Sequence, residues 1–147
     1  MSNETMILLH PVSVHGNEVP EAIFSSKLRK RFPGCYACYR DLCKEKTPTQ
    51  LLGGVQIWSS NYEIYKIVNL YVYTKDEEEN QLLDEKALEN ALSLVRKKWP
   101  KELLVFPFFC RKEPTMDTIL NQYQIQMRNL RFLPVRFKET FGKNQDA

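Results

Sequence analysis

The stretch that decides the fold is residues 10–23, HPVSVHGNEVPEAI, read together with the residues on either side. The segment 5–14 is rich in β-branched and aliphatic residues, which is typical of a β-strand. Over 21–32, apolar side chains recur at spacings of four and five with charges between them, which predicts an amphipathic helix. Glycine, asparagine and proline in between indicate a loop. The chain therefore starts with a strand–loop–helix unit.

The same alternation continues downstream. Pro33 and Gly34 end the first helix, and a second helix is predicted over 35–44, followed by a loop over 45–52. The next residues predict a hairpin, because two runs of β-branched and aromatic residues flank polar turn residues. Its expected strands are 55–59 and 64–74, with the turn at 61–63.

The second half predicts three more elements and a tail. After an acidic loop over 75–81, Asp84 is expected to cap a helix that ends at Trp99 and Pro100. The continuously apolar run 103–109 is typical of a strand buried on both faces. The remaining segments are predicted as a helix over 115–128, a strand over 130–137 and a polar tail over 142–147.

The alternation predicts an α/β protein, a three-layer α/β/α sandwich around a mixed central sheet. The 147 residues fit a single domain, 1–147, without an internal repeat or linker. No stretch approaches the roughly 20 apolar residues of a membrane span, and no signal peptide is recognised, so we expect a cytoplasmic protein without a membrane partner. The net charge of +3 permits anionic partners without requiring them.

The cysteines indicate neither a metal centre nor a disulfide framework. Cys35 and Cys38 form a CxxC, but no second pair follows at zinc-finger spacing. We expect buried or half-buried free thiols, also at Cys43 and Cys110, and no metal or cofactor. A metal site or redox chemistry is the less favoured alternative.

Several stretches together resemble one family. They are 10–23, KRFPGCYACYRDLC at 30–43, LLGGVQI at 51–57, IVNL at 67–70, ALENAL at 87–92 and VFP at 105–107. Their order and spacing are similar to the macro domain, in particular the small branch of viral, phage and cellular ADP-ribose phosphatase-like and deacylase-like proteins. The resemblance implies an ADP-ribose crevice at the carboxyl ends of the strands, lined by two glycine-rich loops whose backbone N–H groups approach the pyrophosphate.

The first of these loops departs from the family pattern. Gly16 and Asn17 remain, but Val19 and Glu21 stand where the later glycines are expected. Glu21 also brings negative charge to a helix N-terminus that an anionic ligand would occupy. The chain further begins too late to supply the family's opening strands, one of which carries the acidic residue that holds adenine. A sheet edge left open in this way favours self-association.

The second loop departs as well. Pro107 is retained, but Cys110 and Lys112 stand at expected glycine positions. Arg111 and Lys112 are candidates to replace the lost N–H groups as anion-binding side chains, together with Gly16, Asn17, Pro107 and Cys110. Their alternative role is that of ordinary surface residues.

His15, Asn17 and Glu21 are the candidate catalytic group, since a histidine and a carboxylate on one loop can act as base and acid. The favoured alternative is a capped helix start with a solvated His15. His10 is expected at a strand end without a role. If the protein is active, the resemblance implies hydrolysis of ADP-ribose phosphate or an ADP-ribosyl ester between residues 14–21 and 107–112.

A cluster of basic residues gives a different hypothesis. Its members are Lys27, Arg29, Lys30 and Arg31, with Arg96, Lys97 and Lys98 on another helix. Tyr36 and Tyr39 lie nearby in the sequence and could stack on bases, although charged helix faces are usually just solvated. The leading hypothesis is a divergent macro-like domain that binds ADP-ribose or a related nucleotide with weak or no catalysis. The alternative is a non-enzymatic module that binds nucleic acid or a protein through basic helix faces.

Overall fold

The computed structural model of the chain describes residues 6–17, 22–59, 65–107, 114–126 and 129–133. Within these ranges six strands form one mixed sheet. They are β1 (Met6–Ser13), β2 (Val55–Ser59), β3 (Tyr65–Lys75), β4 (Gln81–Leu83), β5 (Leu103–Pro107) and β6 (Leu130–Leu133). The helices of the same ranges are α1 (Ala22–Arg31), α2 (Pro33–Glu45), α3 (Pro48–Leu51), α4 (Glu85–Lys98) and α5 (Pro114–Gln126).

The strand order is β2-β3-β1-β5-β6, with β4 paired to the end of β3. β1 is parallel to both β3 and β5, and β5 is parallel to β6. β2 is antiparallel to β3, as the hairpin prediction requires. The sequence predicts an open sheet edge where opening strands are missing. β1 is not such an edge, because it is paired on both sides, with β3 and with β5. Along the described order the ends of the sheet are β2 and β6.

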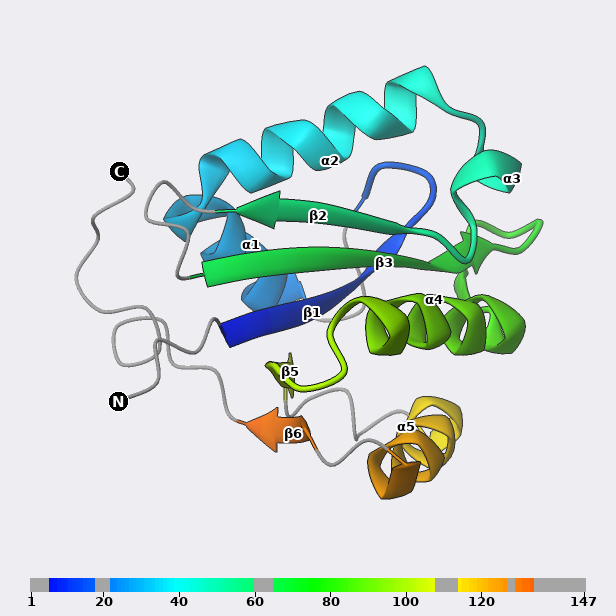
Figure 1. The fold of residues 1–147 in the computed structure, drawn as a ribbon. Coiled ribbons are helices and arrows are strands. Elements are labelled where there is room, and N and C mark those ends of the chain that lie inside the picture. The colour runs from blue at the N-terminus through cyan, green and yellow to red at the C-terminus, as the bar shows by residue number, and fades with distance from the viewer. Residues whose placement is uncertain (1–5, 18–21, 60–64, 108–113, 127–128, 134–147) are drawn as a thin grey trace.

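Helices cover both faces of this sheet (Figure 1). α1 and α2 pack on one face through Phe24, Leu28 and neighbouring apolar residues. α4 and α5 pack on the other face, where one continuous apolar cluster includes Leu88, Leu92 and Leu120. This is the three-layer α/β/α sandwich with a mixed sheet that the sequence predicts.

α4 shows how closely local sequence determines an element. Asp84 is its N-cap, and the side chain accepts a hydrogen bond from the backbone N–H of Ala87 at 2.8 Å. Every third or fourth residue is apolar and buried, so one face of the helix meets the sheet. The helix ends at Lys98, as predicted, because Trp99 and Pro100 follow.

Two short elements and one boundary differ from the predictions. α3 lies inside the expected 45–52 loop, where Thr47 and Gln50 form a capping box. β4 is a short strand that was not predicted from the sequence. It follows the acidic loop and pairs antiparallel with β3. α2 begins at Pro33 and not at 35, because the fixed φ of proline suits the first position of a helix.

Some predicted segments lie partly outside the described residues. The hairpin turn at 61–63, the last residues of the 103–109 and 130–137 strands and the polar tail belong to these. Among the residues that are described, no helix is both long and apolar enough to cross a membrane.

Candidate functional site

The sheet has a topological switch point between β1 and β5. These neighbouring strands are parallel, so their carboxyl ends meet at the same edge of the sheet. The chain leaving β1 enters α1 on one face, whereas the chain leaving β5 enters α5 on the opposite face. The two strands are therefore followed by helices on opposite faces of the sheet, and open α/β sheets bind their ligands in the crevice at such a point.

The loop after β1 carries three of the predicted site residues. Ser13 ends β1, and its hydroxyl accepts a hydrogen bond from the backbone N–H of His15 at 3.0 Å. His15 and Asn17 are exposed, and Gly16 between them is half-buried. The φ of Gly16 is +86°, a conformation that residues with a Cβ rarely adopt. Its backbone turn therefore requires glycine, as anion-binding loops do.

The structure places only part of the remaining predicted group. Pro107 ends β5, is buried, and pairs with Leu133 of β6. Glu21, Cys110, Arg111 and Lys112 lie outside the described residues. The structure thus brings the β1 loop and Pro107 to one end of the sheet, and the roles of the others stay predictions.

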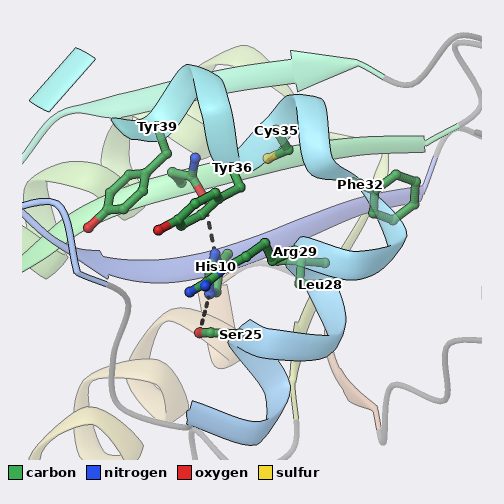
Figure 2. Close-up of a pocket in the computed structure, with 9 residues that line it drawn as sticks. His10, Ser25, Leu28, Arg29, Phe32, Cys35, Tyr36 and Tyr39 are labelled. Carbon is green, nitrogen blue, oxygen red and sulfur yellow. Dashed lines mark hydrogen bonds between the residues drawn. The ribbon is translucent and has the colours of Figure 1, made fainter. Parts of the chain in front are cut away.

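A small cavity lies beneath α1 and α2 (Figure 2). Its floor consists of His10 from β1, Asn69 from β3 and Ser25 from α1, while Arg29 and Tyr36 lie at its outer side. The cavity has a volume of only about 10 Å³, which is room for about one water molecule.

The floor residues belong to a continuous hydrogen-bonded chain, here called the polar chain (Ser25, His10, Asn69 and Gln56). His10 Nε2 lies 3.2 Å from the Ser25 hydroxyl, and His10 Nδ1 lies 3.1 Å from Asn69 Oδ1. Asn69 Nδ2 donates to Gln56 Oε1 at 3.2 Å, and Gln56 Nε2 donates to the backbone carbonyl of Cys38 at 2.9 Å. The polar chain therefore connects α1, three strands and α2.

The partners assign the tautomer of His10. An amide oxygen only accepts, so Nδ1 carries the proton that bonds to Asn69, and Nε2 accepts the hydroxyl proton of Ser25. Burial lowers the pKa of His10 from its ordinary 6.5 to about 4, and the Asn69 hydrogen bond opposes this only in part. His10 is therefore a neutral imidazole at physiological pH.

Ser25, His10 and Asn69 are hydrogen-bonded in the same sequence as the serine, histidine and acidic residue of a catalytic triad. Their surroundings nevertheless exclude a nucleophilic role. Ser25 is 3% exposed, and the cavity above it holds no more than about one water. A histidine with so low a pKa also holds a transferred proton poorly. The polar chain is a structural link between the helices and the sheet.

The expectation that His10 sits at a strand end is wrong, since it is the fifth residue of β1 and is buried. A signal for this existed in the sequence. His10 alternates with Leu8 and Val12, and Asn69 alternates with Ile67 and Tyr71, so each strand places one polar side chain on an otherwise apolar face. Parallel pairing puts His10 opposite Asn69, a register that one strand alone does not reveal.

The predicted basic patch is not one surface, because Arg96, Lys97 and Lys98 lie on α4, across the sheet from α1. The residues of the first helix also differ in exposure. Lys27, Arg29 and Lys30 are exposed on α1, whereas Arg31 is only 8% exposed and its guanidinium lies over the Phe32 ring at 4.8 Å. The expectation that Tyr39 stacks on bases is wrong, because its ring is buried. Its hydroxyl donates to the Ser13 carbonyl at 2.6 Å, and its ring stacks on Tyr71.

The cysteines that the structure describes are free thiols. Cys35 is buried and Cys43 half-buried, as expected, but Cys38 is exposed, because it lies on the outer side of α2. Burial raises the pKa of the Cys43 thiol above its ordinary value, which keeps it protonated. Within the described ranges no three His, Cys, Asp or Glu side chains gather as a metal site would.

Comparisons with solved structures identify the fold. A protein of unknown function from Bacteroides thetaiotaomicron superposes with a TM-score of 0.70 at 15% identity, covering 92% of this chain and 90% of that one. A macrodomain protein from Streptomyces coelicolor gives 0.65 at 15% identity, with 84% and 80% covered. The macrodomain of Mycobacterium tuberculosis DarG gives 0.63 at 15% identity, with 90% and 91% covered.

A further structure is Thermosipho africanus DarTG in complex with ADP-ribose, with a TM-score of 0.60 at 16% identity. The match covers 99% of this chain but 42% of that one. No family model and no curated protein matches the sequence. At these identities the likeness shows the fold alone: the chain has the architecture of a macrodomain.

Proposed function

We propose that this protein binds ADP-ribose or a related nucleotide at the switch point between β1 and β5, with little or no catalysis. The main support is the topology: β1 is followed by α1 on one face of the sheet, and the neighbouring parallel strand β5 is followed by α5 on the other. A crevice at this point receives ligands in open α/β sheets. The ADP-ribose complex of a protein with the same fold supports the choice of ligand.

Gly16 supports a phosphate-binding role for the first loop. Its positive φ is a conformation that lets successive backbone N–H groups converge on an anion, while its missing Cβ faces Cys43 of α2, where a Cβ would lie 3.6 Å from the Cys43 Cβ. Glycine, not a larger residue, stands at the position where the backbone requires it. The loop therefore retains one element of a pyrophosphate cradle.

The same loops argue against efficient catalysis. Val19, Glu21, Cys110 and Lys112 stand where the family has glycines, so their side chains hinder the approach of a pyrophosphate to the backbone N–H groups. Glu21 directly precedes α1 in the sequence, and a carboxylate there competes with an anionic ligand for the helix N-terminus. We infer weak binding and no efficient hydrolysis.

Calorimetric titration with ADP-ribose tests this function. The expected result is micromolar binding that Glu21→Gly strengthens by about 2- to 5-fold, with Glu21→Gln giving a smaller gain. Glu89→Gln, on the exposed side of α4, is the matched control and should leave the affinity unchanged. Absence of heat at millimolar ADP-ribose, in the parent and in Glu21→Gly, would refute the proposal.

A further inference from the structure

The α1–α2 layer carries an excess of positive charge. Residues 22–46 contain seven lysines and arginines but only two acidic residues, although the whole chain is nearly balanced at 21 basic and 18 acidic. The longest acidic run, Asp76–Glu79, lies instead in the turn between β3 and β4. The charges are thus separated, and one helical layer presents a positive surface to solvent.

Tyr36 is an aromatic platform at the centre of this surface. The Arg29 guanidinium lies over its ring, 4.0 Å from the centroid. Arg40, one turn along α2, donates from Nη1 to the Tyr36 hydroxyl at 3.2 Å, with its guanidinium 5.7 Å from the ring centre. Figure 2 shows Arg29 beside Tyr36 on the outer side of the cavity. Both arginines are exposed and Tyr36 is half-exposed.

We propose that this Arg29–Tyr36–Arg40 surface binds single-stranded nucleic acid. An arginine stacked on an aromatic ring is restricted in orientation while its N–H donors still reach phosphate oxygens. A guanidinium plane or the tyrosine ring offers a stacking face to an unpaired base. Bases in a duplex are already stacked on one another, so the duplex gains only the charge interactions.

The surface is distinct from the switch point, because its residues belong to α1 and α2 and not to the segments that follow β1 and β5. The cavity beneath Tyr36 takes no part in it, since a volume of about 10 Å³ excludes a nucleobase. The interaction is with the surface alone.

Fluorescence anisotropy with labelled 20-mers of dT and U, and with a duplex of equal length, tests the proposal. We expect the single strands to bind at 50 mM salt and to lose about 20-fold in affinity at 200 mM, as about three phosphate contacts predict. The duplex should bind several-fold more weakly. Failure of both single strands to bind at 50 mM, or equal binding of the duplex, would overturn the proposal.

Variants locate the surface. Arg29→Glu/Arg40→Glu should weaken binding by at least about 10-fold, whereas Lys97→Glu/Lys98→Glu, the same charge change on exposed residues of α4, should have less than about a 3-fold effect. Tyr36→Ala should weaken binding by about 5-fold or more through lost stacking. Each variant is first checked for an unchanged thermal melting midpoint, and Tyr36→Leu replaces Tyr36→Ala if the latter unfolds.

Competition experiments complete the test. Equal losses in the two double variants would show that only net charge matters. Displacement by a polyglutamate peptide as efficient as by unlabelled oligonucleotide would show a general polyanion surface. Displacement by saturating ADP-ribose would place the nucleic acid at the switch point. Each of these results contradicts the proposal, and resistance to both competitors supports it.

Discussion

The two faces of the sheet are built differently. Against α4 and α5 the sheet presents one continuous apolar cluster, which includes Leu9, Val72 and Phe106. Against α1 and α2 it presents two smaller apolar clusters, one around Leu8 and one around Val12. His10 lies between Leu8 and Val12 on this face. The polar chain therefore runs across the strands between the two apolar clusters.

The two faces contribute differently to the folded structure: one mainly to its stability, the other to the register of its strands. The apolar face supplies stability in proportion to the apolar area that it buries. The polar chain contributes less net free energy because its groups exchange bonds to water for bonds to each other. It instead fixes the pairing of β1 with β3, since His10 and Asn69 face each other only in the observed register.

The largest effect is expected from truncation on the apolar face. Leu92 is fully buried in α4, and Leu92→Ala should reduce the free energy of unfolding by about 2–5 kcal/mol. Leu94 on the same helix is 40% exposed, and Leu94→Ala should cost less than about 1 kcal/mol. Urea denaturation measures both. Similar losses for the pair would mean that this face is not the main source of stability.

The next largest effect is a pH dependence of the free energy of unfolding, which arises from His10 on the face covered by α1 and α2. The pKa of His10 is about 4 when folded and 6.5 ordinarily, so between these values the unfolded chain binds the proton that the folded protein rejects. Stability from this group is intact above pH 6.5, falls as the pH drops toward 4, and levels off below. The full loss is about 3 kcal/mol.

Comparing unfolding free energies at pH 7.5 and pH 4.5 measures this contribution. His10→Gln should show a smaller acid loss than the parent, while His15→Gln, at the only other histidine in the chain, should keep the parental loss. Parallel pH profiles for the parent and His10→Gln would contradict the buried neutral histidine.

A smaller effect should follow from removing single members of the polar chain. Asn69→Ala leaves His10 Nδ1–H without its acceptor and Gln56 without one of its donors, so we expect a loss of about 1–3 kcal/mol. Ser25→Ala removes only one donor and should cost about 1 kcal/mol. The matched control is Ser26→Ala, exposed on the next residue of α1. If Ser25→Ala were as costly as Asn69→Ala, the ranking would be wrong.

The smallest effect concerns how the helices of the two faces begin. α4 is capped by Asp84, whereas α2 begins at Phe32 and Pro33 without a side-chain cap. Asp84→Ala should reduce stability by about 1 kcal/mol, and Asp41→Ala, exposed inside α2, by a few tenths at most. Thermal melting resolves the two. Equal shifts would indicate that the cap is not what stabilises the start of α4.

The apolar face was predictable from the sequence because its signal is local. The spacing of Leu88, Leu92 and Val95 gives the helix and its buried side, and Asp84 gives its start. The hairpin of β2 and β3 and the buried strand β5 follow from continuous runs of β-branched and apolar residues. Strand order was not predictable in the same way, since it depends on pairing between distant segments.

The site was only partly predictable for the same reason. Gly16 stands out because loop chemistry is local, and its positive φ agrees with the role assigned to it. His10 looked isolated because its partners Asn69 and Ser25 come from β3 and α1, and only the folded sheet brings them together. Tyr39 looked like a partner of Tyr36, but residues three apart on a helix need not share solvent exposure when the sheet covers one of them.

We propose that this chain binds its ligand at the carboxyl ends of β1 and β5. A ¹⁵N–¹H correlation titration with ADP-ribose tests it most directly. The account predicts saturable shifts in the amides of residues 13–17 and 108–112, with the amides around Arg29 and Tyr36 unmoved. Shifts confined to the α1–α2 layer, or none at millimolar ligand, would contradict it.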